Sequence, residues 1–311
     1  MPLAGTLDSG KAEKEDEMAG RFGSVITAMV TPFRDDYSLD VEGAQELARW
    51  LLDNGSEALV VAGSTGESPT LSHQEKADLF RAVVEAARGH GKVICGTGTY
   101  NTEETIELTR LAEKTGADAA LVVTPYYNKP PQRGLVAHFT KVADSTSLPL
   151  ILYNIPGRTA CTIEADTLLR LAEIENVVAV KDSTGDFQTA GRIIKESPPD
   201  FELLSGDDWA AFALCCMGAT GVVSVASHLV GDRIREMIEL VHTGDVPAAR
   251  KIHEDLGPIF KALFVTSNPI PVKAALEIAG RPVGPPRLPL VPATPDERGL
   301  VERAMRDVGV L

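Results

Sequence analysis

Cysteine is scarce in this chain. Only four of its 311 residues are cysteine: Cys95, Cys161, Cys215 and Cys216. No two of them have the C-x-x-C spacing, and the last two fall in an apolar, helix-like stretch. We therefore expect buried free thiols in a reducing compartment. No cluster of His, Cys and Asp has metal-ligand spacing, so the sequence does not indicate a bound metal.

Basic residues are also few: 30 Lys and Arg stand against 44 Asp and Glu, which gives a net charge of −14. This charge argues against nucleic-acid binding through a general basic field, although a single cleft can still be basic. No uninterrupted apolar run approaches the length that spans a bilayer. The acid-rich start resembles neither a secretory signal nor a transit peptide. We expect a cytoplasmic protein without membrane contact, with a disordered leader over residues 1–21.

Short β-branched and apolar runs recur along the chain, with amphipathic helical patterns between them. Strands are expected at Val25–Val30, Ala58–Ala62, Val93–Gly96, Ala119–Val123, Leu150–Tyr153, Val177–Val180, Glu202–Leu204 and Gly221–Val225. Helix starts are indicated by two possible capping boxes, Ser72 with Glu75 and Asn101 with Glu104. Eight strand–helix units predict a closed (β/α)8 barrel with helices outside. No G-x-G-x-x-G follows the first strand, which disfavours an open dinucleotide-binding sheet.

Beyond about residue 232 the strand pattern stops. Helices are expected at Asp232–His242, Val246–Phe264, Pro271–Ala279 and Pro295–Val308, the last with Thr294 as its N-cap. The five prolines of Gly280–Pro292 predict a connector outside the core. The expected organisation is a leader (1–21), a barrel (22–243) and a C-terminal helical extension (244–311).

Lys181 follows the apolar run of residues 177–180 directly. Such a run predicts a strand covered on both faces, since alternation is lost there. Most lysines at strand ends simply reach solvent. A partly desolvated lysine, however, holds some neutral amine, the form that attacks carbonyl groups. In a (β/α)8 barrel this position lies at the rim where active sites are found.

Other polar groups follow the expected strand ends and would meet at the same rim. They are Gly63-Ser64-Thr65-Gly66-Glu67-Ser68, Thr124-Pro125-Tyr126-Tyr127, Tyr153-Asn154-Ile155-Pro156-Gly157-Arg158, Ser205-Gly206-Asp207-Asp208 and Gly221-Val222-Val223-Ser224. Each alone has an ordinary interpretation as a turn, a packed tyrosine pair or a surface arginine. Together they place an amine, a phenol, hydroxyls and a guanidinium around one mouth, a set suited to a carbonyl compound with a carboxylate.

These motifs, with Asn268-Pro269-Ile270-Pro271-Val272-Lys273, resemble the dihydrodipicolinate synthase (4-hydroxy-tetrahydrodipicolinate synthase) family of the pyruvate-dependent class I aldolase superfamily. The resemblance runs from about Phe22 to Leu311. It implies a carbon–oxygen lyase of diaminopimelate and lysine biosynthesis, which condenses pyruvate with L-aspartate-4-semialdehyde. No cofactor is implied beyond the enzyme's own amine.

The resemblance also implies residue roles. Lys181 forms a Schiff base with pyruvate, and Tyr153 is the central proton donor and acceptor. Ser64 links the Tyr153 hydroxyl to that of Tyr127, which reaches in from a neighbouring subunit. A homodimer is therefore the least assembly that completes the site, and the family habit is a tetramer built as a dimer of dimers.

Substrate-binding roles are implied in the same way. Thr65 and the turn's N–H groups, with Ser64 beside them, hold the pyruvate carboxylate. Arg158 binds the carboxylate of the second substrate through its planar fork. Gly206 and Val223 complete the expected substrate-binding positions.

Two alternatives stay open. Ser64 stands where the synthases most often have threonine, and G-S-T-G-E is common in N-acetylneuraminate lyase and the aldolases of 2-keto-3-deoxy sugar acids. Arg158 favours the synthase, because those siblings bind polyhydroxylated chains instead. A non-catalytic barrel serving as an anion-binding or scaffold protein is the other alternative.

Feedback by lysine at a dimer interface is known in many members of the family. The matching positions here are Ser68, Pro69, His73, Lys76, Tyr100, Glu104 and Tyr126. Lys76 and Tyr100 replace the histidine and asparagine of the sensitive pattern. Because a cation at Lys76 repels a cationic effector, we expect weak or absent lysine feedback.

Overall fold

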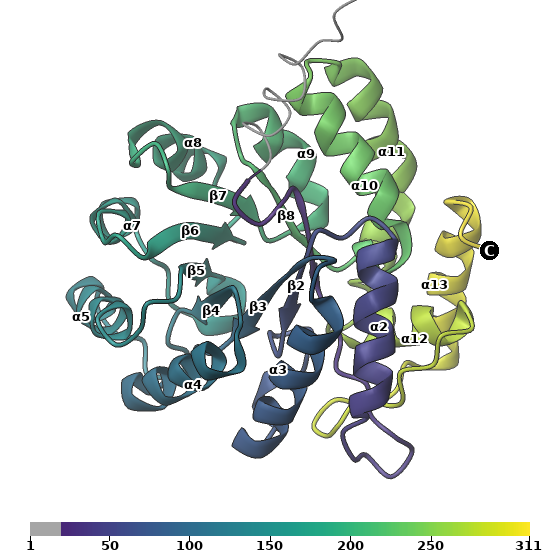
Figure 1. Cartoon of the computed structure of the whole chain (residues 1–311). Helices are drawn as coiled ribbons and strands as arrows, with labels where there is room; N and C mark the ends of the chain where they lie inside the picture. The colour runs from purple at the N-terminus through teal and green to yellow at the C-terminus, as the bar shows by residue number, and fades with distance from the viewer. Residues whose placement is uncertain (1–19) are drawn as a thin grey trace, which may run out of the picture.

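Eight parallel strands close into one barrel in chain order, with β8 paired back onto β1 (Figure 1). The computed structural model describes residues 20–311. The strands are β1 (Val25–Ala28), β2 (Ala58–Val61), β3 (Lys92–Gly96), β4 (Ala119–Val123), β5 (Leu150–Asn154), β6 (Val177–Asp182), β7 (Glu202–Ser205) and β8 (Gly221–Ser224). The predicted (β/α)8 barrel is thus confirmed, with strand ends that differ from the expected ones by two residues at most.

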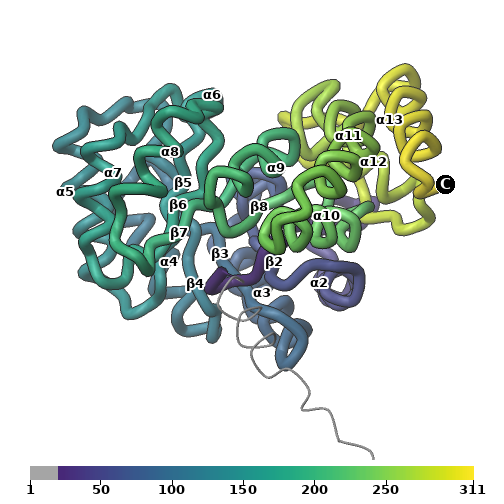
Figure 2. The backbone as a smooth tube through the Cα atoms, turned by 90° about the horizontal axis from the view of Figure 1, so that it is seen from above, coloured from purple at the N-terminus to yellow at the C-terminus, as the bar shows by residue number. Residues whose placement is uncertain are grey.

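Helices surround the barrel. They are α2 (Val41–Asp53), α3 (His73–Ala87), α4 (Thr102–Thr115), α5 (Gln132–Ala143), α6 (Pro156–Thr159), α7 (Ala165–Ala172), α8 (Phe187–Glu196), α9 (Asp208–Met217), α10 (Ser227–His242), α11 (Val246–Ala262), α12 (Ile270–Ile278) and α13 (Pro295–Asp307), with a short 3-10 helix η1 (Ser68–Thr70). Figures 1 and 2 both place α11, α12 and α13 beside α10, on one side of the barrel. The division proposed at residues 243 and 244 falls between α10 and α11.

The helix starts follow the predicted capping chemistry in part. Ser72 and Glu75 form a complete capping box at the start of α3, and Thr294 caps α13. At α4, the Asn101 side chain accepts hydrogen bonds from the first-turn N–H groups. The Glu104 carboxylate does not complete that box, because it pairs with His73 of α3 instead.

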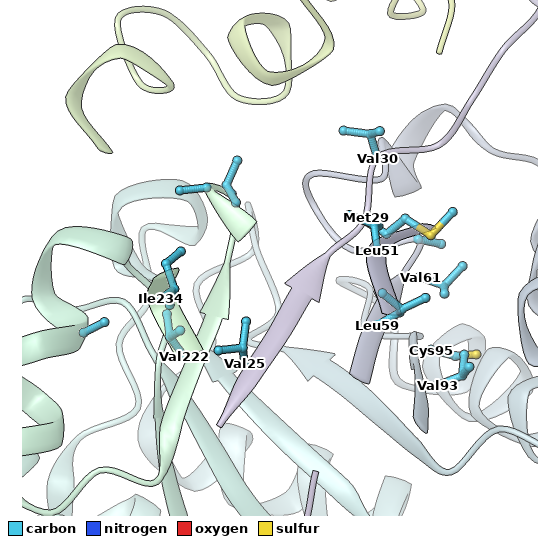
Figure 3. Close-up of a cluster of buried hydrophobic side chains, with 14 of the residues drawn as sticks. Val25, Met29, Val30, Leu51, Leu59, Val61, Val93, Cys95, Val222 and Ile234 are labelled. Carbon is cyan, nitrogen blue, oxygen red and sulfur yellow. The ribbon is translucent and has the colours of Figure 1, made fainter. Parts of the chain in front are cut away.

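The core has two layers, which explains why the strands do not alternate in polarity. Inside the barrel lie small and branched side chains, including Ile26, Val60, Ile94, Leu121 and Val223, with Phe22 among them. The second layer lies between strands and helices. Figure 3 shows part of it, where Val25 and Val222 of adjacent strands lie near Ile234 of α10.

Two expectations about burial are wrong. Cys216 is exposed, whereas the other three cysteines are buried. It follows Cys215 on α9, and one helical step turns the side chain by about 100°. The connector of residues 280–292 also contributes to the core, since Val283 is only 6% exposed. The Val283 carbonyl accepts a hydrogen bond from the Phe33 N–H (3.0 Å), which holds the connector against the loop after β1.

The expected leader is mostly outside the described residues, since only residues 20 and 21 of it are included. There the Arg21 N–H donates a hydrogen bond to the Glu202 carboxylate, and the Arg21 carbonyl accepts one from Lys92. Across residues 20–311, the helices are too short or too polar to cross a bilayer.

Candidate active site

Lys181 and Tyr153 face the inside of the barrel at the carboxyl ends of β6 and β5. Each lies two residues beyond an inward-facing core residue, Ala179 and Ile151, and therefore points to the same face. The two are direct partners in the strand register. The Lys181 Nζ lies 4.1 Å from the centroid of the Tyr153 ring, and both side chains are 5% exposed. Among the described residues, Lys181 takes part in no ion pair, so its amine is not engaged by a carboxylate.

Gly206 forms the wall next to the lysine. A Cβ at this position would lie 3.0 Å from the Lys181 Cε and 2.0 Å from the Ser183 Oγ. A side chain therefore does not fit without displacing the amine or the serine. The absence of a Cβ at residue 206 keeps open the space in which Lys181 sits.

The turn after β2 carries two of the expected binding residues, Ser64 and Thr65. It is tightly folded, since a Cβ at Gly66 would lie 3.0 Å from the backbone of Ala62. The Thr31 hydroxyl donates to the Gly66 carbonyl (2.6 Å) and fixes the turn against the loop after β1. Thr65 is only 4% exposed, and its hydroxyl oxygen accepts a hydrogen bond from a side chain outside the turn, that of Asn268.

A cavity of about 330 Å³ opens at this rim. Its lining includes Ser64, Tyr153 and Arg158 of the expected site. Lys181 lies just behind, against the Tyr153 ring. Val223 belongs to the same inner cluster as Tyr153. The structure thus brings together the expected residues of the second, fifth, sixth, seventh and eighth strand ends.

Tyr127 is not part of this arrangement. Its side chain is 91% exposed, and its backbone has a left-handed φ of 72°, a conformation that non-glycine residues seldom adopt. Its neighbour Tyr126 does line the cavity and packs edge-on against Tyr100, with ring centroids 5.4 Å apart. Burial and the nearby Glu104 carboxylate raise the pKa of the Tyr126 hydroxyl.

The expected effector positions lie beside the cavity. Ser68 and Pro69 line it, and His73 pairs with Glu104 at 3.2 Å. Lys76 is 5% exposed, and burial lowers the pKa of its ammonium group, an effect opposed by the Glu104 carboxylate. The cation expected to repel a cationic effector is therefore mostly enclosed by the protein.

Sequence reasoning missed two groups at the site that come from beyond the barrel. Asn268 lines the cavity, and its Nδ2 donates a hydrogen bond to the Thr65 Oγ1 (2.8 Å). Lys273 of α12 forms an ion pair of 2.6 Å with Glu67, and both side chains are at most 3% exposed. The N-P-I-P-V-K motif contains both residues, but a motif alone does not say what they contact.

Asp208, which the sequence placed at the rim, anchors the end of β8. Its carboxylate accepts hydrogen bonds from the Val225 and Ala226 N–H groups and from the Ser224 hydroxyl. Burial raises the pKa of this carboxyl group. The S-G-D-D motif suggested a site residue here, whereas the structure uses Asp208 to hold the eighth strand end.

No group of three or more His, Cys, Asp or Glu side chains within residues 20–311 has the geometry to hold a metal ion.

This arrangement defines a class of protein: a (β/α)8-barrel enzyme whose lysine amine can attack a carbonyl compound. The family follows from comparison. The sequence model of the dihydrodipicolinate synthetase family matches residues 21–308, and the chain belongs to that family.

Relatives agree over nearly the full chain. The 4-hydroxy-tetrahydrodipicolinate synthase of Moorella thermoacetica is 50% identical over 291 residues, which are 94% of this chain and 100% of the relative. The crystal structure of the synthase from Cyanidioschyzon merolae with lysine bound is 47% identical, with a TM-score of 0.93, covering 94% of this chain and 100% of that one. A structure described as the first monomeric dihydrodipicolinate synthase variant is 40% identical, with a TM-score of 0.91, covering 95% and 98%.

Proposed function

We propose that this chain condenses pyruvate with L-aspartate-4-semialdehyde as a 4-hydroxy-tetrahydrodipicolinate synthase. The observation that carries the proposal is the buried Lys181 amine, which has no carboxylate partner within residues 20–311 and packs against the Tyr153 ring beside the cavity. The alternative of a non-catalytic barrel that serves as an anion-binding or scaffold protein is disfavoured, because a relative named as this synthase matches 94% of the chain at 50% identity.

The chemistry begins at the lysine. The neutral Lys181 amine attacks the carbonyl carbon of pyruvate, and loss of water gives an iminium on the enzyme. The iminium withdraws electrons, so the methyl group loses a proton and becomes an enamine carbon nucleophile. This carbon attacks the aldehyde of the second substrate. The amine of that substrate then displaces Lys181 from the imine, which closes the ring and frees the enzyme.

Proton transfer is assigned to hydroxyl groups. Tyr153 gives and takes the protons of imine formation, and Ser64 passes them onward to Tyr127 of a neighbouring subunit. The 91% exposure of Tyr127 on its own chain supports a role outside that chain's cavity. We propose a homodimer as the least active unit and a tetramer as the assembly, without nucleic-acid or membrane partners and in the cytoplasm.

Substrate binding is assigned to two groups, one for the carboxylate of each substrate. Thr65 and Ser64, with the N–H groups of their turn, receive the pyruvate carboxylate. Arg158 receives the carboxylate of the aldehyde substrate. Gly206 and Val223 shape the space around the covalent adduct. No resident cofactor enters this scheme, since the covalent pyruvate iminium on Lys181 accepts the electron pair that is left when the methyl group loses its proton.

The test is a coupled assay with dihydrodipicolinate reductase, followed by loss of NADPH absorbance. We expect a robust rate that disappears in Lys181→Ala and persists in Lys195→Ala, which changes an exposed lysine of α8. Borohydride with pyruvate should modify the wild type and the Lys195 variant, and leave the Lys181 variant unmodified.

The second candidate is a sibling aldolase for a 2-keto-3-deoxy sugar acid or an N-acetylneuraminate-type substrate, and the serine at position 64 favours it. Trapping by borohydride without any condensation of aspartate semialdehyde would move the protein to that reaction. If the protein shows neither borohydride trapping nor turnover, the remaining interpretation is a non-catalytic barrel.

A further inference from the structure

Asn268 stands at the active site although it belongs to the loop between α11 and α12. It is 6% exposed and lines the cavity, 203 positions along the chain from the turn that it contacts. Neither the barrel strands nor their loops supply it. The group therefore reaches the rim only because the C-terminal helices pack beside the barrel.

The side-chain amide determines which way the Thr65 hydroxyl points. A hydroxyl has one hydrogen to donate and two lone pairs to accept with. Since the Thr65 Oγ1 accepts from the Asn268 Nδ2 at 2.8 Å, its own hydrogen is not used in that bond. The hydrogen therefore remains available for another acceptor, and Ser64, the residue before Thr65 in the turn, lines the cavity.

The backbone of the same residue contacts a second group of the expected site, Arg158, which lines the cavity. The Asn268 carbonyl accepts a long hydrogen bond, 3.4 Å, from the Arg158 Nη2. One residue thus contacts both groups that the proposed function assigns to substrate carboxylates. The Asn268 Oδ1 is buried without a hydrogen-bond partner among the described residues.

We propose that Asn268 is a positioning residue for pyruvate: its amide holds the Thr65 hydroxyl so that the hydroxyl donates its hydrogen to the pyruvate carboxylate. The inference rests on the proposed function for its substrate. A hydrogen bond to a charged group is stronger than one between neutral groups, so a misdirected hydroxyl weakens binding of the anion.

Aspartate at position 268 would reverse the direction of the hydrogen bond with Thr65. A carboxylate has no hydrogen to donate, and it would draw the Thr65 hydrogen toward itself and away from the cavity. Asparagine and aspartate have nearly the same shape, so this change alters the direction of the hydrogen bond more than the packing.

The experiment measures the rate of borohydride inactivation against pyruvate concentration, without the second substrate. We expect Asn268→Ala to raise the half-saturating pyruvate concentration about tenfold, a size typical of one hydrogen bond to an ion. Thr65→Val should raise it at least as much, and the double variant no further than Thr65→Val alone. Asn268→Asp should be worse than Asn268→Ala, and this excess should shrink in the Thr65→Val background.

Asn176→Ala is the matched control. The Asn176 side chain donates to the carbonyls of Ala143, Thr146 and Leu148 just before β6, at the opposite end of the barrel from the cavity. Its loss should lower the melting temperature and leave the half-saturating pyruvate concentration unchanged. A purely structural role for Asn268 would produce the same result as this control.

Several outcomes overturn the inference. They are an unchanged half-saturation in Asn268→Ala, full function in Asn268→Asp, or effects of Asn268→Ala and Thr65→Val that multiply in the double variant. Failure of the proposed function is distinguishable, because it shows in the wild type: the unaltered chain would then not condense aspartate semialdehyde in the coupled assay, whether or not pyruvate is trapped.

Discussion

Lys181 and Tyr153 are register partners on adjacent strands, and the lysine Nζ lies 4.1 Å from the centre of the tyrosine ring. The face of the aromatic ring packs against the lysine Nζ and holds the side chain in place without forming an ion pair with it. A carboxylate in the same place would fix the amine as an ion pair. The pairing thus leaves the amine free for a carbonyl substrate.

Gly206→Ala should inactivate the enzyme without unfolding it. The new Cβ would lie 2.0 Å from the Ser183 Oγ, so the serine must move, and 3.0 Å from the Lys181 Cε, so the lysine is crowded as well. We expect turnover in the coupled assay to fall about 100-fold, as for small displacements of a catalytic group. Ser183→Ala in the same chain should recover part of it; no recovery would mean that the lysine contact dominates.

Tyr127 should act across a subunit boundary. Because the side chain is 91% exposed, Tyr127→Phe should change the free energy of unfolding by less than about 0.5 kcal/mol. Its turnover should nevertheless fall strongly. When Tyr127→Phe is mixed with Lys181→Ala and the subunits exchange, activity should return, since the hybrid dimer holds one complete site. A mixture that stays inactive after exchange has been verified would place Tyr127 in its own chain's cavity.

The buried Glu67–Lys273 pair should be costly to break from one side. The two groups are 2.6 Å apart and almost fully enclosed, and burial lowers the pKa of Lys273 while Glu67 opposes that shift. Lys273→Met leaves a carboxylate buried without its cation, and we expect a loss of about 3–5 kcal/mol in urea unfolding. The double variant with Glu67→Gln should regain most of it. A loss below about 1 kcal/mol would show that the pair is replaceable by packing alone.

His228 should make the protein less stable in mild acid. Its Nε2 accepts from the Val30 N–H and its Nδ1 contacts the Val225 carbonyl, and burial lowers the pKa of the ring to about 4. The unfolded chain takes up this proton near pH 6.5, so the stabilising contribution is complete above that pH. It is lost between about pH 6.5 and 4, by about 3 kcal/mol. His228→Gln should be less stable at neutral pH, with a flatter dependence over this interval in urea unfolding.

Lysine should inhibit this enzyme weakly or not at all. The expectation rests on Lys76, an enclosed cation that would repel a cationic effector, and on Tyr100, which by the family resemblance stands where sensitive members have asparagine. We expect unchanged turnover at millimolar lysine. Lys76→His together with Tyr100→Asn should gain sensitivity, while strong inhibition of the unaltered chain would overturn the expectation.

Local pattern was sufficient for the barrel and for the residues at its strand ends. The apolar run before Lys181 predicted a strand covered on both faces, and β6 is such a strand. Parallel strand ends meet at one rim. The sequence alone therefore predicts that Tyr153, Arg158 and the turn at Ser64 lie together. Their assigned roles remain predictions, to be tested by the variants above.

Long-range contacts were beyond the reach of pattern. The Asn268–Thr65 bond joins residues 203 positions apart, and nothing in the local sequence of either one encodes it. The prolines of the connector indicate a stiff backbone and say nothing about burial, so they do not predict that Val283 is buried. Cys216 was misplaced because an all-apolar helix gives no sign of which face is covered.

The C-terminal part of the chain also determines when, during synthesis, the turn after β2 makes all of its contacts. Glu67 is held by Lys273 and by the Arg287 N–H, 220 positions later, and Thr65 by Asn268. A nascent chain with all eight strands already made still lacks every one of these groups. The binding turn therefore gains its C-terminal contacts only after the end of the chain has left the ribosome. Loss of the segment from Asn268 onward would remove these contacts and leave Thr31 to hold the turn, while sparing the barrel strands.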